Sequence, residues 1–89
     1  MFEWDDAKSE ATLRSRGFDF AYAALIFEGP VLEFDDTRRS YGEQRICAIG
    51  RVDQDILLVV YTWRGRTRRI ISARPANRKE RDGYRQAFG

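Results

Sequence analysis

The 89-residue sequence predicts an α+β fold, in which two N-terminal helices pack on a four-stranded antiparallel meander sheet that a C-terminal helix follows. Apolar residues recur with the helical period up to Phe27 and with a period of two from Val31 onward. Short polar or glycine-containing segments separate the strand-like runs, which is typical of consecutive antiparallel strands. A chain of this length is one domain, residues 1–89, and its 43% hydrophobic content predicts that it folds.

Capping residues mark both ends of the first helix. Asp5 is placed to accept hydrogen bonds from the amides of the first turn, and the helix is expected to run to about Arg16. Gly17 supplies the left-handed residue that commonly follows a helix. Before this helix, Phe2–Trp4 is a short apolar stretch that fits an additional edge strand.

A second helix is expected after Asp19, which is its predicted cap. Apolar residues spaced i, i+3, i+4 and i+7 form one face of this helix, namely Phe20, Ala23, Ala24 and Phe27. The pair Gly29-Pro30 ends it. We expect both N-terminal helices to cover the same face of the sheet.

Four strands are predicted after the helices, at Val31–Asp35, Arg45–Val52, Ile56–Tyr61 and Arg68–Arg74. The third of these is nearly all apolar, which indicates a central strand covered on both faces. A hairpin turn at Gly65 joins it to the last strand. Asn77 and Glu80 then have the spacing of a capping box, which predicts a final helix.

Strict alternation along the last strand predicts which side chains share a face. It places Arg68, Ile70, Ser72 and Arg74 on one side and Arg69, Ile71 and Ala73 on the other. Two basic zones follow, one at the hairpin tip and one around Arg74 and the start of the final helix. The two zones form one continuous surface only if the sheet twists or the final helix folds back along the sheet.

Positive charge is concentrated in the second half of the chain. Residues 1–44 carry five bases and ten acids, whereas residues 45–89 carry eleven bases and four acids. Eight of the bases lie between Tyr61 and Arg81, and fourteen of the sixteen in the chain are arginines. A GC-rich genome also enriches arginine, and it accounts for scattered arginines better than for a cluster. Because the planar guanidinium binds two phosphate oxygens at once, the cluster points to a polyanion such as RNA.

Several functions are excluded by missing residues. The chain has no histidine, so a histidine-based acid–base pair or catalytic triad is not available. Cys47 lies in an apolar run and is interpreted as a core residue, and the acidic run Glu33–Asp36 as a solvated strand end rather than a Mg²⁺ site. Without a phosphate-binding glycine motif, no nucleotide cofactor and no metal are expected. The acidic N-terminus and short apolar runs predict a cytoplasmic protein with no membrane contact.

Three segments resemble the BrnT family, the small toxins of bacterial type II toxin–antitoxin pairs. They are "FEWDDAK" near the start, "GEQRICAIG" in the middle and "RRIISARPANRKERDGY" near the end, in the family's order and spacing. The resemblance implies a RelE-like fold and a ribonuclease that cleaves RNA and arrests growth. It also implies a BrnA-like antitoxin, a complex that reaches promoter DNA only through that antitoxin, and room for a toxin homodimer within the complex.

Two positions depart from the family pattern. Arg16 stands where many members have the histidine of "KHG", and Trp63 stands where many have the glutamate of "TERG". A mechanism that requires either of those residues cannot be carried over to this chain.

Arg64 and Arg69 are the first candidates to stabilise the negative charge that develops on phosphorus during RNA cleavage. Proton transfer has three candidates, Lys8, Glu80 and Tyr84. Each also has a simpler interpretation, because Lys8 fits a solvated helix face, Glu80 a capping residue and Tyr84 a packing residue. The side chains expected to hold RNA are Trp63, Arg66, Arg68, Arg74, Arg78 and Arg81.

Two other functions fit the same basic surface. It could bind nucleic acid or an acidic partner without any chemistry. It could also be the face on which the antitoxin docks, in which case the same arginines are buried in the complex.

Overall fold

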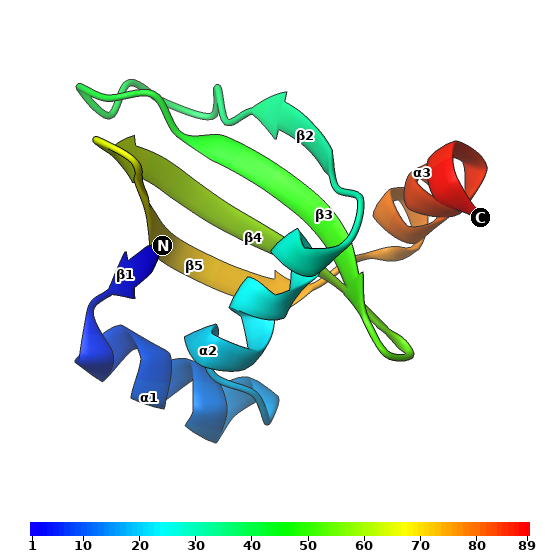
Figure 1. Cartoon of the computed structure of the whole chain (residues 1–89), viewed down its shortest axis with the longest axis horizontal. Coiled ribbons are helices and arrows are strands. Elements are labelled where there is room, and N and C mark those ends of the chain that lie inside the picture. Colours follow the sequence, from blue (N-terminus) through cyan, green and yellow to red (C-terminus); the bar gives the residue numbers. More distant parts are fainter.

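The computed structural model describes residues 1–89 and contains a five-stranded mixed sheet with strand order β1-β5-β4-β3-β2 (Figure 1). The strands are β1 (Phe2–Trp4), β2 (Leu32–Asp35), β3 (Ile46–Val52), β4 (Asp55–Arg64) and β5 (Thr67–Pro75). The helical segments are α1 (Asp6–Arg16), α2 (Phe20–Ala23), the 3₁₀ helix η1 (Ala24–Glu28) and α3 (Arg78–Phe88). The predicted α+β class is confirmed.

The prediction of a four-stranded antiparallel sheet is wrong in one respect. Strands β2 to β5 form the predicted antiparallel meander, and the additional edge strand expected at Phe2–Trp4 is confirmed as β1, but it pairs in parallel with β5 and makes the sheet five-stranded and mixed. Its register runs from Phe2 opposite Arg68 to Trp4 opposite Ile70. Without β1, this stretch of β5 would be an open edge, and covering an edge limits unwanted pairing with other chains.

The predicted helix ends are confirmed by their hydrogen bonds. The Asp5 carboxylate accepts from the amides of Ala7 and Lys8 at 2.9 and 3.2 Å, and Gly17 follows α1 with a φ of 86°. At α3, the Asn77 side chain accepts from the Glu80 amide and the Glu80 carboxylate accepts from the Asn77 amide, both at 2.8 Å. The capping box therefore sets the start of α3.

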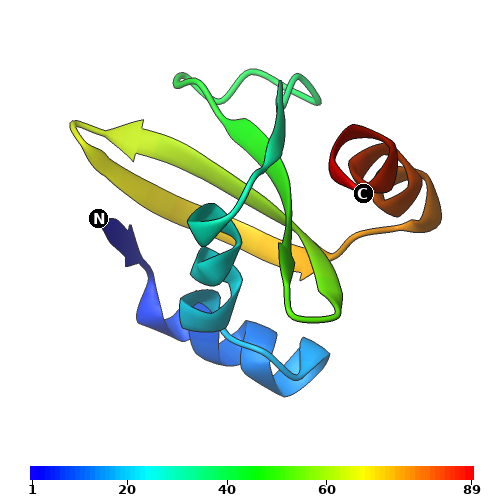
Figure 2. The same ribbon diagram turned by 45° about the vertical axis from the view of Figure 1, so that its right-hand side comes forward.

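The second predicted helix differs from the expectation, because only Phe20–Ala23 is α-helical and the remainder is the 3₁₀ segment η1. This segment crosses the sheet over β3 (Figure 2). At the crossing, Ile26 packs so tightly on Gly50 that a Cβ atom at residue 50 would lie 2.6 Å from the Ile26 Cβ. The absence of a side chain at Gly50 thus permits the close approach.

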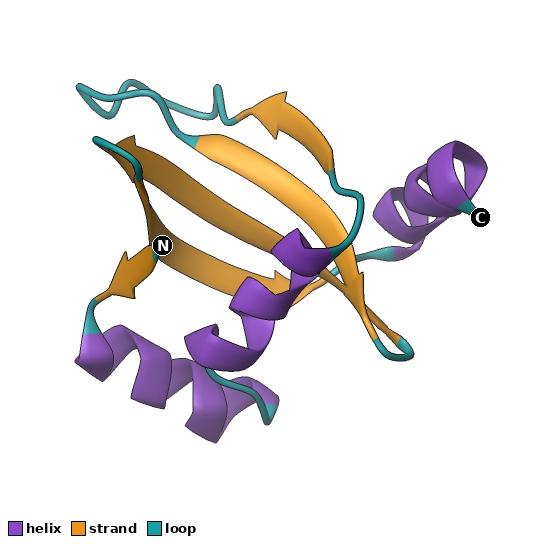
Figure 3. Cartoon of the chain, in the orientation of Figure 1, coloured by secondary structure: helices purple, strands orange, loops and turns teal.

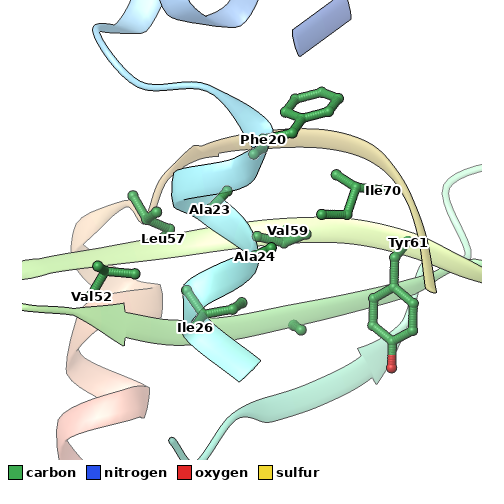
Figure 4. Packing of buried hydrophobic residues seen from close by; sticks show 11 residues of the cluster. Phe20, Ala23, Ala24, Ile26, Val52, Leu57, Val59, Tyr61 and Ile70 are labelled. Atoms are coloured by element: carbon green, nitrogen blue, oxygen red, sulfur yellow. The ribbon is translucent and has the colours of Figure 1, made fainter. Parts of the chain in front are cut away.

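Two hydrophobic cores lie on opposite faces of the sheet, with α1, α2 and η1 on one face and α3 on the other (Figure 3). The larger core packs Phe20 and Ile26 against Val59, Tyr61 and Ile70 (Figure 4). The smaller core lies under Tyr84 of α3 and contains Cys47, Ile49, Ile56, Leu58 and Val60. Both N-terminal helices therefore cover one face, as predicted, and β4 is buried on both sides. The interpretation of Cys47 as a core residue is also confirmed.

A β-bulge in β5 overturns the predicted alternation of the last strand. Val60 pairs with Ser72 and Tyr61 pairs with Ile70, so Ile71 has no partner on β4. As a result, Ile70 and Ala73 point into the same core although they are three residues apart. An extra residue in one strand shifts the facing of every residue beyond it.

Gly50→Ala is expected to destabilise the fold by about 1–3 kcal/mol, because the added methyl group must displace Ile26 from a filled core. Urea denaturation measured by circular dichroism gives this value. Gly29→Ala is the matched control, since a Cβ atom there meets no atom within 4 Å and the residue has a φ of −125°. Equal stability of the two variants would contradict the proposed packing.

Candidate functional site

The bulge divides the predicted arginine cluster between the two faces of β5. Arg68 lies on the face that carries the N-terminal helices, where its guanidinium packs over the ring of Phe27. Arg69 lies on the opposite face, since its partner Glu3 alternates with Phe2 and Trp4, which pack in the larger core. Arg74 shares this opposite face with α3. The prediction that Arg68 and Arg74 share a face is therefore wrong.

The two basic zones remain separate. Arg64 and Arg66 lie at the hairpin tip between β4 and β5, at the end of the sheet far from α3 (Figure 1). Arg64 is exposed, and its Nη2 atom is 3.5 Å from Glu43 in the β2–β3 loop. Arg78 and Arg81 lie one turn apart on α3, where Arg81 donates to the carbonyl oxygen of Ala76 at 2.7 Å. Arg69 lies between the two zones along β5, and its side chain is 33% exposed.

Arg74 and Glu80 form a two-pronged ion pair at the start of α3. The two Nη atoms donate to the two carboxylate oxygens at 2.8 and 2.9 Å. The bonds from Arg74 hold the pKa of the Glu80 carboxyl below its usual range. Glu80 is therefore ionised, and its interpretation as a capping residue is confirmed.

A cleft of about 440 Å³ lies beside this ion pair, between the β2–β3 loop and the end of β5. Side chains of both signs line it, including Arg16, Arg38, Asp36 and Ser72 in addition to the Arg74–Glu80 pair. The Cys47 thiol also lines it, and burial raises the pKa of that thiol, so it stays protonated. The cleft consequently offers arginine donors and a serine hydroxyl, and its serine and cysteine lack an activating base.

Asp36 organises the rim of this cleft. Its carboxylate accepts from the Arg38 guanidinium at 2.8 and 2.9 Å and from the Tyr41 hydroxyl at 3.3 Å. The Asp36 side chain is 1% exposed, so the prediction that the whole run Glu33–Asp36 is a solvated strand end is wrong at this residue. The bonds from Arg38 lower the pKa of Asp36 to about 2. The Asp36–Arg38 pair could not be predicted from the sequence, because both residues lie in a polar loop with no periodic pattern.

The proton-transfer candidates are widely separated in the structure. Lys8 is exposed on α1, on the face opposite α3. Tyr84 is buried under α3, and its hydroxyl donates to the carbonyl oxygen of Pro30 at 2.9 Å. The structure therefore brings Arg69, Arg74 and Glu80 to one face, leaves Arg64 at the hairpin tip and does not gather the whole predicted set.

A family model matches residues 4–80 and describes a ribonuclease toxin, BrnT, of type II toxin–antitoxin systems. The chain belongs to the BrnT ribonuclease toxin family. Membership in this family implies an RNA substrate and an antitoxin partner. No curated protein sequence matches this BrnT chain. None of its helices has the length and apolar character needed to span a bilayer.

The family match includes Arg69, Arg74 and Glu80 but ends before Tyr84. Sequence reasoning missed three residues that line the cleft with Arg74, namely Asp36, Arg38 and Ser72. Ser72 was obscured by its apolar neighbours Ile71 and Ala73, and only the bulge shows that it faces the cleft.

Asp36→Asn is expected to weaken the fold in a pH-dependent way. The folded-state pKa of Asp36 lies below its usual value of 3.8, so the carboxylate stabilises the fold above about pH 4 and loses this effect as the pH falls towards 2. Urea titrations from pH 7 to pH 2 should show a stability difference between the natural chain and the variant that shrinks below pH 4. Asp35→Asn is the control, because this exposed neighbour accepts one bond, from Gln44. A difference that stays constant down to pH 2 would contradict the role of Asp36.

Proposed function

We propose that this BrnT chain is a metal-independent endoribonuclease that arrests growth in the cytoplasm and is neutralised by a BrnA-like antitoxin. Family membership supports RNA as the substrate. The observation that carries the rest is the placement of Arg69 and Arg74 on one face of β5 by the bulge. Two of the three carboxylates that line the cleft, Asp36 and Glu80, are already bound to arginines, which favours chemistry based on arginine over chemistry based on a carboxylate-held metal.

Arg69 and Arg74 are spaced to hold an extended RNA strand. Five residues of β-strand span roughly 16 Å, so the two guanidiniums can bind phosphates that are more than one nucleotide apart. Each is oriented by a carboxylate but keeps further donors. Arg69 uses Nη1 on Glu3, and Arg74 leaves its Nε atom without a protein acceptor, so each can still bind phosphate.

The chemistry we propose is attack by a ribose 2′-oxygen on the neighbouring phosphorus. The 2′-hydroxyl loses its proton, the new P–O bond forms, and the bond to the 5′-oxygen breaks as that oxygen takes up a proton. The products are a 2′,3′-cyclic phosphate and a 5′-hydroxyl. Negative charge on the phosphate oxygens rises in the transition state, and one well-placed donor contributes about 3–4 kcal/mol to its stabilisation. Arg69 is our first candidate for this donor, and Arg64 at the hairpin tip is the second.

The candidates for proton transfer are limited by the bonds that Tyr84 and Glu80 already make. The Tyr84 hydroxyl is bonded to a backbone carbonyl, and Glu80 is held ionised by Arg74. Because the chain also lacks histidine, we propose that solvent removes the 2′ proton and that the arginines supply the catalysis.

A second candidate function is a non-catalytic basic module that binds nucleic acid or an acidic partner. The observation that favours it is the ion pairing of Asp36 and Glu80, which occupies the most buried carboxylate of the cleft and the carboxylate beside Arg74. Purified protein incubated with RNA in EDTA separates the candidates. Cleavage supports the nuclease, whereas salt-sensitive binding without cleavage supports the module.

Arg69→Lys is expected to reduce RNA cleavage by about 100- to 1000-fold, because a lysine keeps the charge but loses the planar fork. The measurement is single-turnover cleavage of a labelled RNA by protein purified from its antitoxin, with circular dichroism to confirm folding. Arg64→Ala in the same assay tests the second candidate at the hairpin tip.

Two control variants isolate the role of Arg69. Glu3→Gln removes the ion-pair partner of Arg69 and should keep most of the cleavage activity. A loss of activity as large as that of Arg69→Lys would show that the ion pair supports the fold and that Arg69 is not itself a catalytic residue. Arg85→Ala removes an exposed arginine of α3 away from the site and should cleave normally. Full activity of a folded Arg69→Lys variant would overturn the assignment.

A further inference from the structure

An aromatic cage surrounds Arg68 on the face opposite the proposed cleavage site. The guanidinium carbon of Arg68 lies 4.3 Å from the centre of the Phe27 ring, 4.6 Å from Trp63 and 5.2 Å from Tyr61. The rings of Tyr61 and Trp63 meet edge to face at 5.8 Å. Cation–π contacts of this kind fix the guanidinium in place without neutralising its charge.

Arg68 differs from the other β5 arginines in having no acidic partner. Arg69 and Arg74 are each 2.8 Å from a carboxylate, whereas no carboxylate lies within 4 Å of Arg68. Its Nε atom is buried and has no hydrogen-bond acceptor within the protein. This enclosed atom is out of reach of a ligand, so an anionic group binding here has to contact the Nη atoms of the guanidinium, whose charge no carboxylate neutralises.

Trp63 forms the exposed wall of the cage. It is 45% exposed although it is among the largest apolar side chains of the protein. Trp63 and Arg68 are direct partners across β4 and β5, and they lie near the exposed turn that carries Arg66. A flat aromatic surface beside an uncompensated guanidinium is the combination that stacks a base and holds its phosphate.

We propose that Trp63 and Arg68 form a second RNA subsite, in which one unpaired base stacks on Trp63 and its phosphate is bound by Arg68. The proposal rests on the proposed ribonuclease function and adds the substrate class, single-stranded RNA. The phosphate binds on the side of Arg66. Glu33, which accepts a hydrogen bond from the Tyr61 hydroxyl, makes the other side of the cage unfavourable for an anion.

The position of the subsite explains why the substrate is single-stranded. The next pair along the hairpin, Thr62 and Arg69, faces the opposite side of the sheet. RNA that contacts both Arg69 and Trp63 must therefore bend around the hairpin tip at Gly65. The bases of a duplex are stacked on one another. A duplex can therefore neither bend around the hairpin tip nor place a base on Trp63.

The test uses a 2′-O-methyl hexanucleotide, which lacks the attacking 2′-hydroxyl and is not cleaved. In a Trp4→Phe background, Trp63 is the remaining tryptophan, so its fluorescence reports stacking directly. We expect quenching by the single strand and none by the corresponding duplex. Trp63→Ala should weaken binding, measured by anisotropy, by about five- to a hundredfold, which is the range for stacking of one base. Trp63→Phe should retain most of the affinity.

Further variants separate this proposal from the cleavage site. The Arg69→Lys variant should lose RNA cleavage, but RNA should still quench its Trp63 fluorescence. If RNA quenches Trp63 in the natural chain and the natural chain does not cleave RNA, the subsite stands and the proposed nuclease activity is wrong. Phe88→Ala removes a similarly exposed aromatic residue on α3 and should not change binding. The proposal is overturned if folded Trp63→Ala binds the single strand as the natural chain does. It is also overturned if that variant loses only the antitoxin.

Discussion

The unpaired residue Ile71 in β5 is the constraint on which the basic surface depends. Ile71 has no partner on β4. The side chains that follow it therefore point to the opposite face from the one that regular alternation with the preceding residues would give them. Arg69 and Arg74 then share the α3 face, while Arg68 lies on the other. The same shift keeps Ile70 and Ala73 in one core, so the fold and the charge distribution depend on a single local irregularity.

Electrostatic pairing gives each arginine of β5 a different role. Glu3 and Glu80 orient Arg69 and Arg74 and reduce their net charge, but they leave further donors for phosphate. Arg68 is oriented by aromatic rings and keeps its full charge. The arginines of β5 therefore lie on two faces of the sheet, whereas strict alternation had placed Arg68 and Arg74 on one.

The sequence predicted those features that depend on local signals. Asp5, Gly17 and the Asn77–Glu80 box set helix ends through bonds within one turn, so their residue types suffice. The bulge, the parallel pairing of β1 and the burial of Asp36 depend on distant partners and could not be read from a periodic pattern. Glu80 was predicted correctly as a cap, but its bond to Arg74 required the fold. The Tyr61–Glu33 contact likewise joins residues far apart in the chain.

We propose that RNA binds the α3 face through Arg69 and Arg74. Its most direct test is a titration of ¹⁵N-labelled protein with the 2′-O-methyl oligonucleotide, in which the arginine Nε–Hε signals are followed by NMR. We expect the signals of Arg69 and Arg74 to shift together and saturate, while that of Arg85 stays in place. Saturable shifts confined to other arginines, with Arg69 and Arg74 unchanged, would contradict it.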